Sequence, residues 1–525
     1  MTAYRLIVAA VAFVTVAAAG SAAPPTYDHI VVVVEENRSL SQVIGSPSAP
    51  YINSLAATGA SLTGMYGLTH PSQPNYLHLF SGSNQGATSN VTPATLPFTT
   101  SNLGAALVAA GRTFVGYAES LPSVGFTGDS FSANPPLNEY VRKHNPWVNW
   151  LASTPAGNQL PSTVAQPFTA FPTDYTQLPK VSFVIPNEQH NMHDGTIAQA
   201  DAWLQSNLGG YAAWAAANNS LLIVTWDEDN SAERNRIPTI FSGANVRQGD
   251  VAGTWTLHNL LRTLEDMNGA SHSGSAAAVQ PIVGAFTGDP DVSVVTFQQG
   301  DAGGYASATD TWIEAAAPAT PHGGSATATI DGGPLSQGLV RFDDLFGAGG
   351  RIPHGATIHS AKLTILTGGN SSADSVSLHR MLVPWNDAAT WSTFGSGVDT
   401  DGVEAASAAE FQLIPNVLDA NAIFDVTGSL QSWQADPTLN QGWLLQDATG
   451  TDGWVWHTAE AATLNQRPQL SVVYSVPEPG GLPAAVAAVM TWWAAWRTAR
   501  PSASTAKICR DPRPGSGRRR LATAA

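Results

Sequence analysis

Five β-branched residues stand in a row near the start of the chain, Ile30-Val31-Val32-Val33-Val34, and three polar residues, Glu35-Glu36-Asn37, follow directly. An unbroken run of this kind is typical of a strand that is buried on both faces of a parallel sheet. In such sheets ligands bind beyond the carboxyl ends of the strands. The stretch therefore predicts an α/β fold with polar, chemically active residues at the end of its first strand.

Strand-like and helix-like segments alternate from this point to about residue 288. Further strands are predicted at 113–117, 181–185, 221–226 and 238–241, and helices at 101–110, 196–208 and 256–267. Alternation of this kind predicts a doubly wound, mostly parallel sheet. We assign it to residues 24–290.

Two other predicted strands also run into polar residues. Carboxylate, amide and imidazole groups are ligands for divalent cations, and two adjacent carboxylates repel unless a cation lies between them. The alternatives are a solvated acidic turn after the first strand, with Glu35 facing solvent or supporting Glu36, and surface histidines in a loop. The candidates are Glu36, Asn37, His190, His193, Asp194, Asp227 and Glu228.

A second stretch, His70-Pro71-Ser72-Gln73-Pro74-Asn75-Tyr76, passes from turn residues into an apolar segment that reads as a helix. A serine at a helix start lies near free backbone N–H groups and the positive end of the helix dipole. This position suits a nucleophile that attacks phosphorus, with the N–H groups and Asn75 holding the phosphoryl oxygens. The alternative is that Ser72 only caps the helix.

Two further histidines are weaker candidates for binding an anionic substrate. His144 lies in a locally basic loop beside Arg142 and Lys143. His258 lies on the predicted helix 256–267 and shares a face with Leu261 and Leu264, so a histidine at the edge of the core is at least as good an interpretation.

The composition argues against some functions and structural features of the chain. The net charge of −16 argues against a nucleic-acid partner, and a single cysteine, Cys509, excludes an intramolecular disulfide. Residues 1–23 have the positive start, apolar run and small residues of a secretory signal peptide, which predicts a secreted protein.

The second half of the chain has a different character. After a linker predicted at 291–300, short alternating strands separated by turns predict an antiparallel β-sandwich over residues 301–475. Residues 476–500 contain an apolar run flanked by arginines, which we interpret as a C-terminal anchor helix. Residues 501–525 are basic and are predicted to be disordered.

Four motifs in order resemble the bacterial phosphoesterase family of the alkaline-phosphatase-like superfamily, which includes acid phosphatases, phosphatidylinositol-phosphate phosphatases and phospholipases C. They are the stretch 27–39, the stretch 70–76, Ile185-Pro186-Asn187 with Met192-His193-Asp194-Gly195, and Trp226-Asp227-Glu228. Together they cover about residues 27–270.

The resemblance implies a role for each candidate. Ser72 would be the nucleophile that forms a phosphoserine, and Asn75 would bind the phosphoryl group. Glu36, Asn37, Asp227 and Glu228 would bind metal, and His190, His193 and Asp194 would contact metal or phosphate. Arg236 stands where some relatives have histidine, and it could bind phosphate directly.

The second half resembles a DNRLRE-type β-sandwich domain, related to carbohydrate-binding modules, and residues 476–500 resemble a PEP-CTERM sorting tail. These resemblances imply binding to extracellular polysaccharide, processing by an exosortase and a place in the cell envelope or on the surface. The sequence as a whole predicts a secreted, metal-dependent phosphomonoesterase. A phospholipase C or phosphodiesterase at the same centre, and a non-catalytic surface protein that keeps the fold, are the alternatives.

Overall fold

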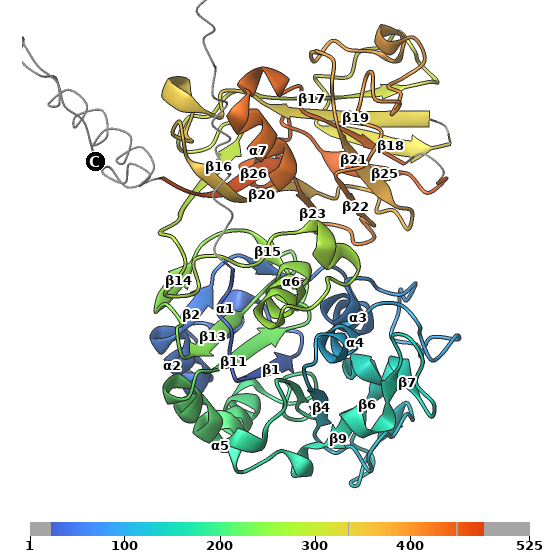
Figure 1. The fold of residues 1–525 in the computed structure, drawn as a ribbon. Coiled ribbons are helices and arrows are strands. Elements are labelled where there is room, and N and C mark those ends of the chain that lie inside the picture. The colour runs from blue at the N-terminus through green and yellow to red at the C-terminus, as the bar shows by residue number, and fades with distance from the viewer. Residues whose placement is uncertain (1–22, 334, 448–449, 477–525) are drawn as a thin grey trace, which may run out of the picture. The chain divides into compact units, whose positions relative to one another are not determined.

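The computed structural model describes residues 23–333, 335–447 and 450–476 (Figure 1). The predicted signal peptide, sorting segment and basic tail lie outside these residues, except for Ala23 and Val476. Among the helices that are described, none combines the length and the apolar character that crossing a bilayer requires.

The first part of the chain is built on an eight-stranded sheet whose strand order is β14-β2-β13-β11-β1-β10-β4-β9. The five strands from β11 to β9 are mutually parallel. The strands are β1 (His29–Glu35), β2 (Ala60–Leu62), β4 (Phe114–Ala118), β9 (Ala165–Pro167), β10 (Val181–Ile185), β11 (Ser220–Trp226), β13 (Thr239–Gly243) and β14 (Gly249–Val251).

β1 lies in the middle of this sheet, between β10 and β11, and residues 30–34 are completely buried. Val31 is paired with Ser182 on one side and with Leu222 on the other. A strand with neighbours on both edges and helices on both faces has no exposed surface, which explains why its sequence is apolar without alternation. The α/β sheet predicted from this run is confirmed.

The sheet is mixed at one side, because β13 is antiparallel to β11. The connection between these two strands, residues 227–238, contains no helix. A parallel pairing would need a crossover connection, so the chain reverses direction here.

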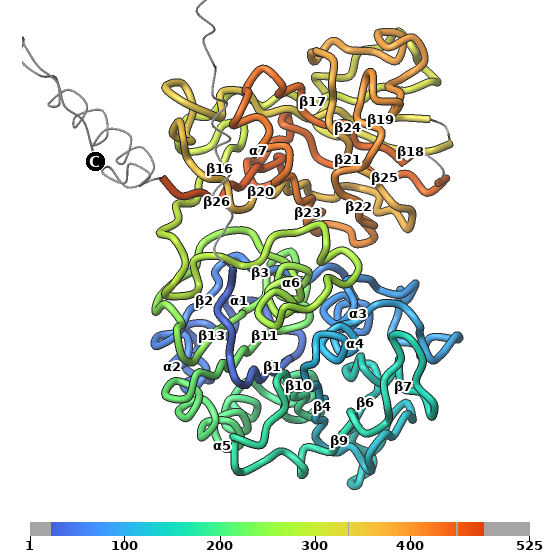
Figure 2. The backbone as a smooth tube through the Cα atoms, in the orientation of Figure 1, coloured from blue at the N-terminus to red at the C-terminus, as the bar shows by residue number. Residues whose placement is uncertain are grey.

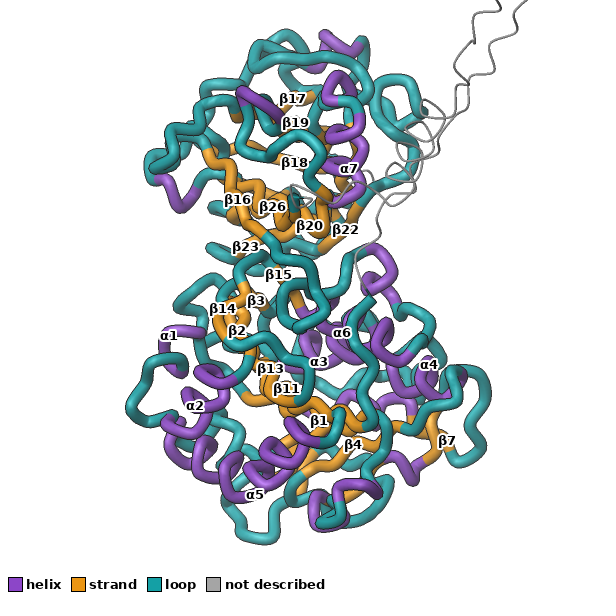
Figure 3. The backbone as a smooth tube through the Cα atoms, turned by 60° about the vertical axis from the view of Figure 1, so that its left-hand side comes forward, coloured by secondary structure: helices purple, strands orange, loops and turns teal. Residues whose placement is uncertain are grey.

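Helices cover both faces of the sheet (Figure 3). One group packs α2 (Pro50–Thr58) against α5 (Ile197–Ala217), and α5 against β11. The other group packs α6 (Leu257–Asn268) against α3 (Ser72–Ser81) and α4 (Leu103–Ala109). A short helix, α1 (Leu40–Val43), follows β1. A small second sheet contains three strands, β12 (Arg236–Ile237), β3 (Met65–Tyr66) and β15 (Trp255–Thr256). In the chain, β3 comes before α3, and β15 comes directly before α6.

Residues 293–475 form two antiparallel sheets, in the yellow to red part of the chain (Figure 2). Buried side chains from both, such as Leu363 and Trp443, share one core, as in a β-sandwich. One sheet contains β16 (Ser293–Gln298), β26 (Gln469–Ser475), β20 (Thr357–Leu366) and β23 (Asn421–Asp425). The other contains β22 (Phe411–Leu413), β21 (Val376–Arg380), β24 (Trp443–Gln446), β19 (Leu335–Phe342), β18 (Thr327–Gly332) and β25 (Trp454–His457), with β17 (Ala308–Glu314) beside β19. The helix α7 (Thr427–Ala435) follows β23.

Part of the predicted linker 291–300 is a strand. Residues 293–298 form β16, which pairs with β26 along its whole length. The sequence Ser-Val-Val-Thr-Phe-Gln is rich in β-branched and aromatic residues, and its Phe297 is buried in the sandwich core.

Candidate active site

Three neighbouring parallel strands end together at one edge of the large sheet. β11, β1 and β10 deliver Asp227-Glu228, Glu36-Asn37 and the loop 187–195, respectively. The backbone joins these segments, since Glu36 N donates to Asn191 O and Asp227 N donates to Glu35 O. The prediction that these polar residues meet at one edge is correct.

Ser72 is the first residue of α3 and is almost fully buried. Its Oγ lies 2.9 Å from Glu228 Oε1 and 3.1 Å from Glu36 Oε2, within hydrogen-bond reach of both. Pro71 occupies the N-cap position, and the helix has no side-chain cap. The hydroxyl of Ser72 is therefore directed at carboxylates and does not cap the helix.

The first turn of α3 offers fewer free donors than the sequence suggests. Gln73 N donates to Asn90 Oδ1 at 3.0 Å, and Pro74 has no N–H. Asn75, predicted to bind a phosphoryl group, accepts from Leu68 N and Thr69 N and donates to Thr69 O. In this structure Asn75 fixes the loop before Ser72.

Asp227 is the residue of this centre whose surroundings fit a cation best. Both of its carboxylate oxygens are buried without a hydrogen-bond partner, although Ser72 and two backbone N–H groups lie close enough to lower its pKa somewhat. Burial and the neighbouring Glu228 raise the pKa of Asp227 well above its usual value. Burial, together with the nearby Asp227 and Glu188, likewise raises the pKa of Glu36 well above its usual value. A divalent cation would remove this cost, so the residues fit a metal.

Asn37 adjoins these acids. Its backbone is in the left-handed region, with φ of 45°, and its Nδ2 lies 3.3 Å from Glu36 Oε2. Asparagine tolerates this conformation better than most residues. The turn places the Asn37 side chain beside Glu36, with the amide nitrogen toward that carboxylate.

A second group forms around Glu188. His193 Nδ1 lies 3.1 Å from Glu188 Oε2 and 2.8 Å from Asp194 Oδ1, and the three residues could hold a metal ion through atoms within 4.8 Å of one another. Met192 turns the loop with a φ of 76° while its side chain is buried, which is rare for a residue other than glycine.

His144 connects the two groups. Its Nε2 lies 3.2 Å from Glu36 Oε1, its Nδ1 lies 2.8 Å from Glu188 Oε1, and the side chain is 1% exposed. Burial lowers the pKa of His144 to about 4. Burial alone would raise the pKa of Glu188, but His144, His193 and Lys143 hold it at about 2. The predicted substrate-binding His144 thus lies between the two acidic groups.

Three residues of the site were not predicted. Tyr76 donates to Glu36 Oε1 at 2.5 Å, and its ring stacks on His144. His70 Nδ1 lies 2.6 Å from Glu228 Oε2; burial opposes its protonation, but Asp229 and Glu228 raise the pKa of His70 to about 9. Glu188 could have been found, because it follows β10 as Glu36 follows β1. Tyr76 and His70 could not, because their contacts depend on how α3 packs.

Three predicted residues have their contacts elsewhere. His190 Nδ1 lies 3.0 Å from Glu119. Arg236 Nε donates to Thr63 O at 2.8 Å, so part of its guanidinium is held by the backbone between β2 and β3. Glu35 is fully buried and neither of its carboxylate oxygens has a hydrogen-bond partner, so it neither faces solvent nor hydrogen-bonds Glu36, and both halves of that expectation are wrong. As the last residue of β1, it points to the opposite face of the sheet from Glu36.

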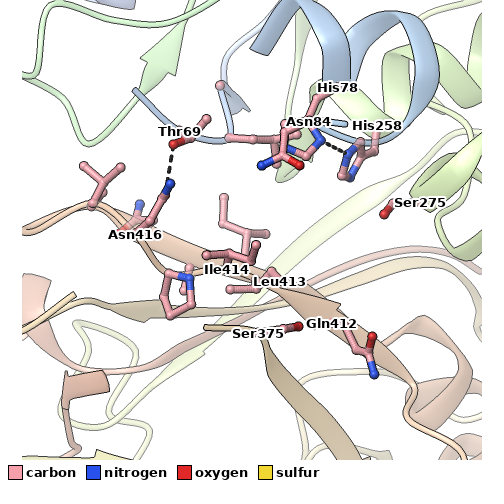
Figure 4. A pocket seen from close by; sticks show the side chains of 18 of the residues that line it. Thr69, His78, Asn84, His258, Ser275, Ser375, Gln412, Leu413, Ile414 and Asn416 are labelled. Atoms are coloured by element: carbon pink, nitrogen blue, oxygen red, sulfur yellow. Dashed lines mark hydrogen bonds between the residues drawn. The ribbon is translucent and has the colours of Figure 1, made fainter. Parts of the chain in front are cut away.

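His258 lines a pocket of about 270 Å³ (Figure 4). Its Nε2 lies 3.0 Å from His78 Nδ1, and Thr69, in the same wall, donates to Asn416 at 2.9 Å. Burial lowers the pKa of His258 well below its usual value and that of His78 to about 4. His258 is therefore a buried, neutral partner of His78. This agrees with the alternative interpretation of His258 as a histidine at the edge of the core.

The fold and these contacts define a class of site: a serine hydroxyl held by buried carboxylates at the carboxyl edge of an α/β sheet. Comparison with known proteins gives the family. The model of the phosphoesterase family matches residues 46–269. A phosphatidylinositol-3-phosphatase of Mycobacterium tuberculosis is 50% identical over 267 residues, which cover 50% of this chain and 84% of the relative.

More distant proteins are also similar. An acid phosphatase of Aspergillus fumigatus is 31% identical over 207 residues, which cover 37% of this chain and 43% of that protein. A crystal structure of an alkaline phosphatase superfamily protein from Vibrio parahaemolyticus aligns with 48% of this chain and 68% of its own, at 12% identity and a TM-score of 0.34. The chain belongs to the phosphoesterase family, and it is a phosphoric-ester hydrolase.

Proposed function

We propose that the protein is a metal-dependent phosphatase that hydrolyses phosphate monoesters, with Ser72 as the nucleophile. The observation that carries this proposal is the position of the Ser72 hydroxyl, within 3.1 Å of both Glu36 and Glu228. A serine needs an adjacent base or a cation to become nucleophilic, and this serine has candidates for both.

The chain's own residues provide the path of the proton. Ser72 Oγ donates to Glu228 Oε1, so this carboxylate is ready to receive the proton as Oγ attacks phosphorus. His70, whose pKa is raised to about 9, lies 2.6 Å from the other oxygen of this carboxylate. The P–O bond to the leaving group breaks, and the proton on Glu228 passes to the leaving oxygen or to solvent. Water then attacks the phosphoserine: its oxygen joins phosphorus, the P–Oγ bond breaks, and a proton of the water restores the Ser72 hydroxyl.

The residues that would hold metal are Glu36, Asn37, Asp227 and Glu228, with Glu188, His193 and Asp194 as a second group. A bound divalent cation would neutralise the carboxylates and stabilise negative charge on the reacting oxygens. Tyr76 and His144 both contact Glu36 Oε1, so they orient this carboxylate toward the centre.

The substrate that we propose is a phosphate monoester on a small molecule or on a phospholipid headgroup. The relative that is 50% identical is named for removing phosphate from a phosphatidylinositol phosphate, and such a lipid carries its phosphate as a monoester. This resemblance supports a lipid headgroup as the first substrate to test.

The test compares wild-type protein and Ser72→Ala, each with divalent metal and with a chelator, on p-nitrophenyl phosphate and on its bis-ester. We expect monoester turnover by the metal-loaded wild type alone. Turnover by Ser72→Ala at the wild-type rate would remove Ser72 as nucleophile. Faster turnover of the bis-ester would favour a phosphodiesterase, and turnover of neither ester would favour a non-catalytic protein.

We also propose that the protein is exported and that its β-sandwich tethers it to surface polymer. The composition of residues 1–23 and 476–500 supports export. N-terminal sequencing of protein recovered outside the cell should show a start near residue 24. An intact residue 1 in that fraction would contradict cleavage of a signal peptide.

A further inference from the structure

The proposed reaction centre is strongly acidic, which is a difficulty for an enzyme whose substrate is an anion. A fully ionised monoester carries two negative charges, and a diester carries one. Each additional charge on the substrate raises the repulsion from the carboxylates that metal does not neutralise. The acidic residues in or beside the centre are Glu36, Glu188, Asp194, Asp227, Glu228 and Asp229.

Lys143 brings a positive charge into this environment. Its Nζ lies 3.3 Å from His193 Nε2. The ammonium also acts on both acidic groups: it opposes the rise in the pKa of Glu36 that burial and Asp227 cause, and it helps to keep the pKa of Glu188 low.

The backbone around Lys143 is fixed on both sides. The residue is the middle of a 3-10 helix, Arg142–His144. Arg142 is buried and donates to Asn149 Oδ1 at 3.0 Å, and His144 is wedged between Glu36 and Glu188. Lys143 itself is half-buried, and its ammonium lies beside His193.

The hydrogen bonds leave this ammonium with free donors. His193 Nδ1 faces two carboxylates, at 3.1 and 2.8 Å. Its Nε2 lies next to Lys143 Nζ and takes up at most one of the N–H groups of the ammonium. An ammonium has three N–H groups, so two remain for the oxygens of a bound phosphoryl group.

We propose that Lys143 pairs with the second negative charge of a phosphate monoester and thereby makes the site prefer monoesters over diesters. This inference rests on the proposed phosphatase function and assigns its specificity to one side chain. The pairing is electrostatic, so it acts on a dianion more strongly than on a monoanion at the same distance.

The experiment measures kcat/KM of the full, metal-loaded chain for p-nitrophenyl phosphate and bis-p-nitrophenyl phosphate at about pH 8, where the monoester is a dianion because its second pKa is about 6. Lys143→Gln should lower kcat/KM for the monoester about 100-fold and for the diester less than about 5-fold. Lys143→Arg keeps the charge and should recover most of the monoester activity.

The matched control is Arg112→Gln, which removes one positive charge from an exposed position just before β4. β4 runs parallel to β10, so Arg112 lies at the edge of the sheet away from the site, and neither kcat/KM should change. Thermal unfolding should show that all variants fold.

Losses that are equal for both esters, or no loss for either, would overturn the inference while the phosphatase function stands. Failure of Lys143→Arg to exceed Lys143→Gln would overturn it as well, because charge would then not be the cause. Wild-type protein that hydrolyses neither ester would overturn the proposed function and the inference with it.

Discussion

Two buried charged clusters in this molecule differ in one respect. In the β-sandwich, Lys362 Nζ lies 2.6 Å from Asp425 Oδ2, and Thr427 donates to Asp425 Oδ1, so the buried carboxylate is fully paired. In the α/β part, Asp227 is buried just as deeply, and neither of its oxygens has a hydrogen-bond partner. The first cluster is paired within the chain, whereas the second is not, and it could accept a cation. Burial of charge alone therefore does not mark a functional site; in this molecule the two clusters differ in whether the chain itself pairs the buried carboxylate.

The largest effect that we expect is a loss of phosphatase activity when the cluster around Asp227 is changed. Asp227→Asn keeps the shape of the side chain but removes the charge that would hold a cation. We expect kcat/KM for p-nitrophenyl phosphate to fall about 10,000-fold, because the nucleophile and its cation act as a unit. The stability of the metal-free protein should rise or stay the same, since an unpaired buried charge is lost. A variant that keeps more than a tenth of the activity would contradict the role of Asp227.

The paired cluster should respond in the opposite way. Asp425→Asn leaves Lys362 buried without a counter-charge, and the free energy of unfolding should fall by about 4 kcal/mol. Turnover of p-nitrophenyl phosphate at a temperature where the variant is folded should not change. Chemical denaturation would measure the first value, and an unchanged midpoint would show that the pair is not structural.

Metal should stabilise one cluster alone. A divalent cation at 100 times its Kd should raise the free energy of unfolding by about 2.7 kcal/mol relative to chelated protein. The same increase should appear in Asp425→Asn and disappear in Asp227→Asn. Thermal unfolding of the three proteins with and without metal makes this comparison, and an increase that persists in Asp227→Asn would place the ion elsewhere.

A smaller effect concerns Glu265 on α6, a buried acid that is only half paired. Glu265 Oε1 accepts from Ser273 N, while Oε2 has no hydrogen-bond partner, and burial raises its pKa to about 8 from 4.5. The folded protein therefore keeps a proton that the unfolded chain has lost, so stability falls as the pH rises through this interval. Between about pH 6.5 and about pH 8 the loss is about 2 kcal/mol.

Glu265→Gln keeps the acceptor for Ser273 but cannot ionise. Its unfolding free energy should lose this pH dependence, and the variant should be more stable than wild type at about pH 8. Parallel slopes for the two proteins would mean that Glu265 is already ionised in the folded state.

The same comparison shows what sequence can predict. The strands β1, β10 and β11 follow from their apolar runs, and Glu36, Asp227 and Glu228 follow because residues after parallel strands share one edge. Whether a carboxylate is paired depends on partners that are distant in sequence. Glu35 and Glu36 are adjacent, yet the alternation of the strand sends them to opposite faces, and only the packing around each face decides which carboxylate has partners.

Other candidate residues also show that sequence does not reveal which donors are free. The side chain of Asn90 occupies the N–H of Gln73, and this contact depends on the conformation of a loop. Asn75 and Arg236 carry donors suited to phosphate, but the backbone oxygens of Thr69 and Thr63 use at least part of them. His258 meets His78 only because α6 packs on α3. Residue type and spacing indicated the chemistry, and packing decided which groups remained available.

The central claim is that the Ser72 oxygen itself attacks phosphorus. Metal-loaded enzyme mixed with a fast-leaving monoester, quenched in acid within one turnover and digested, should yield a peptide containing Ser72 that is heavier by one phosphoryl group. Ser72→Ala should yield no such peptide. A phosphoryl group found on another residue, or full turnover by Ser72→Ala, would contradict the account.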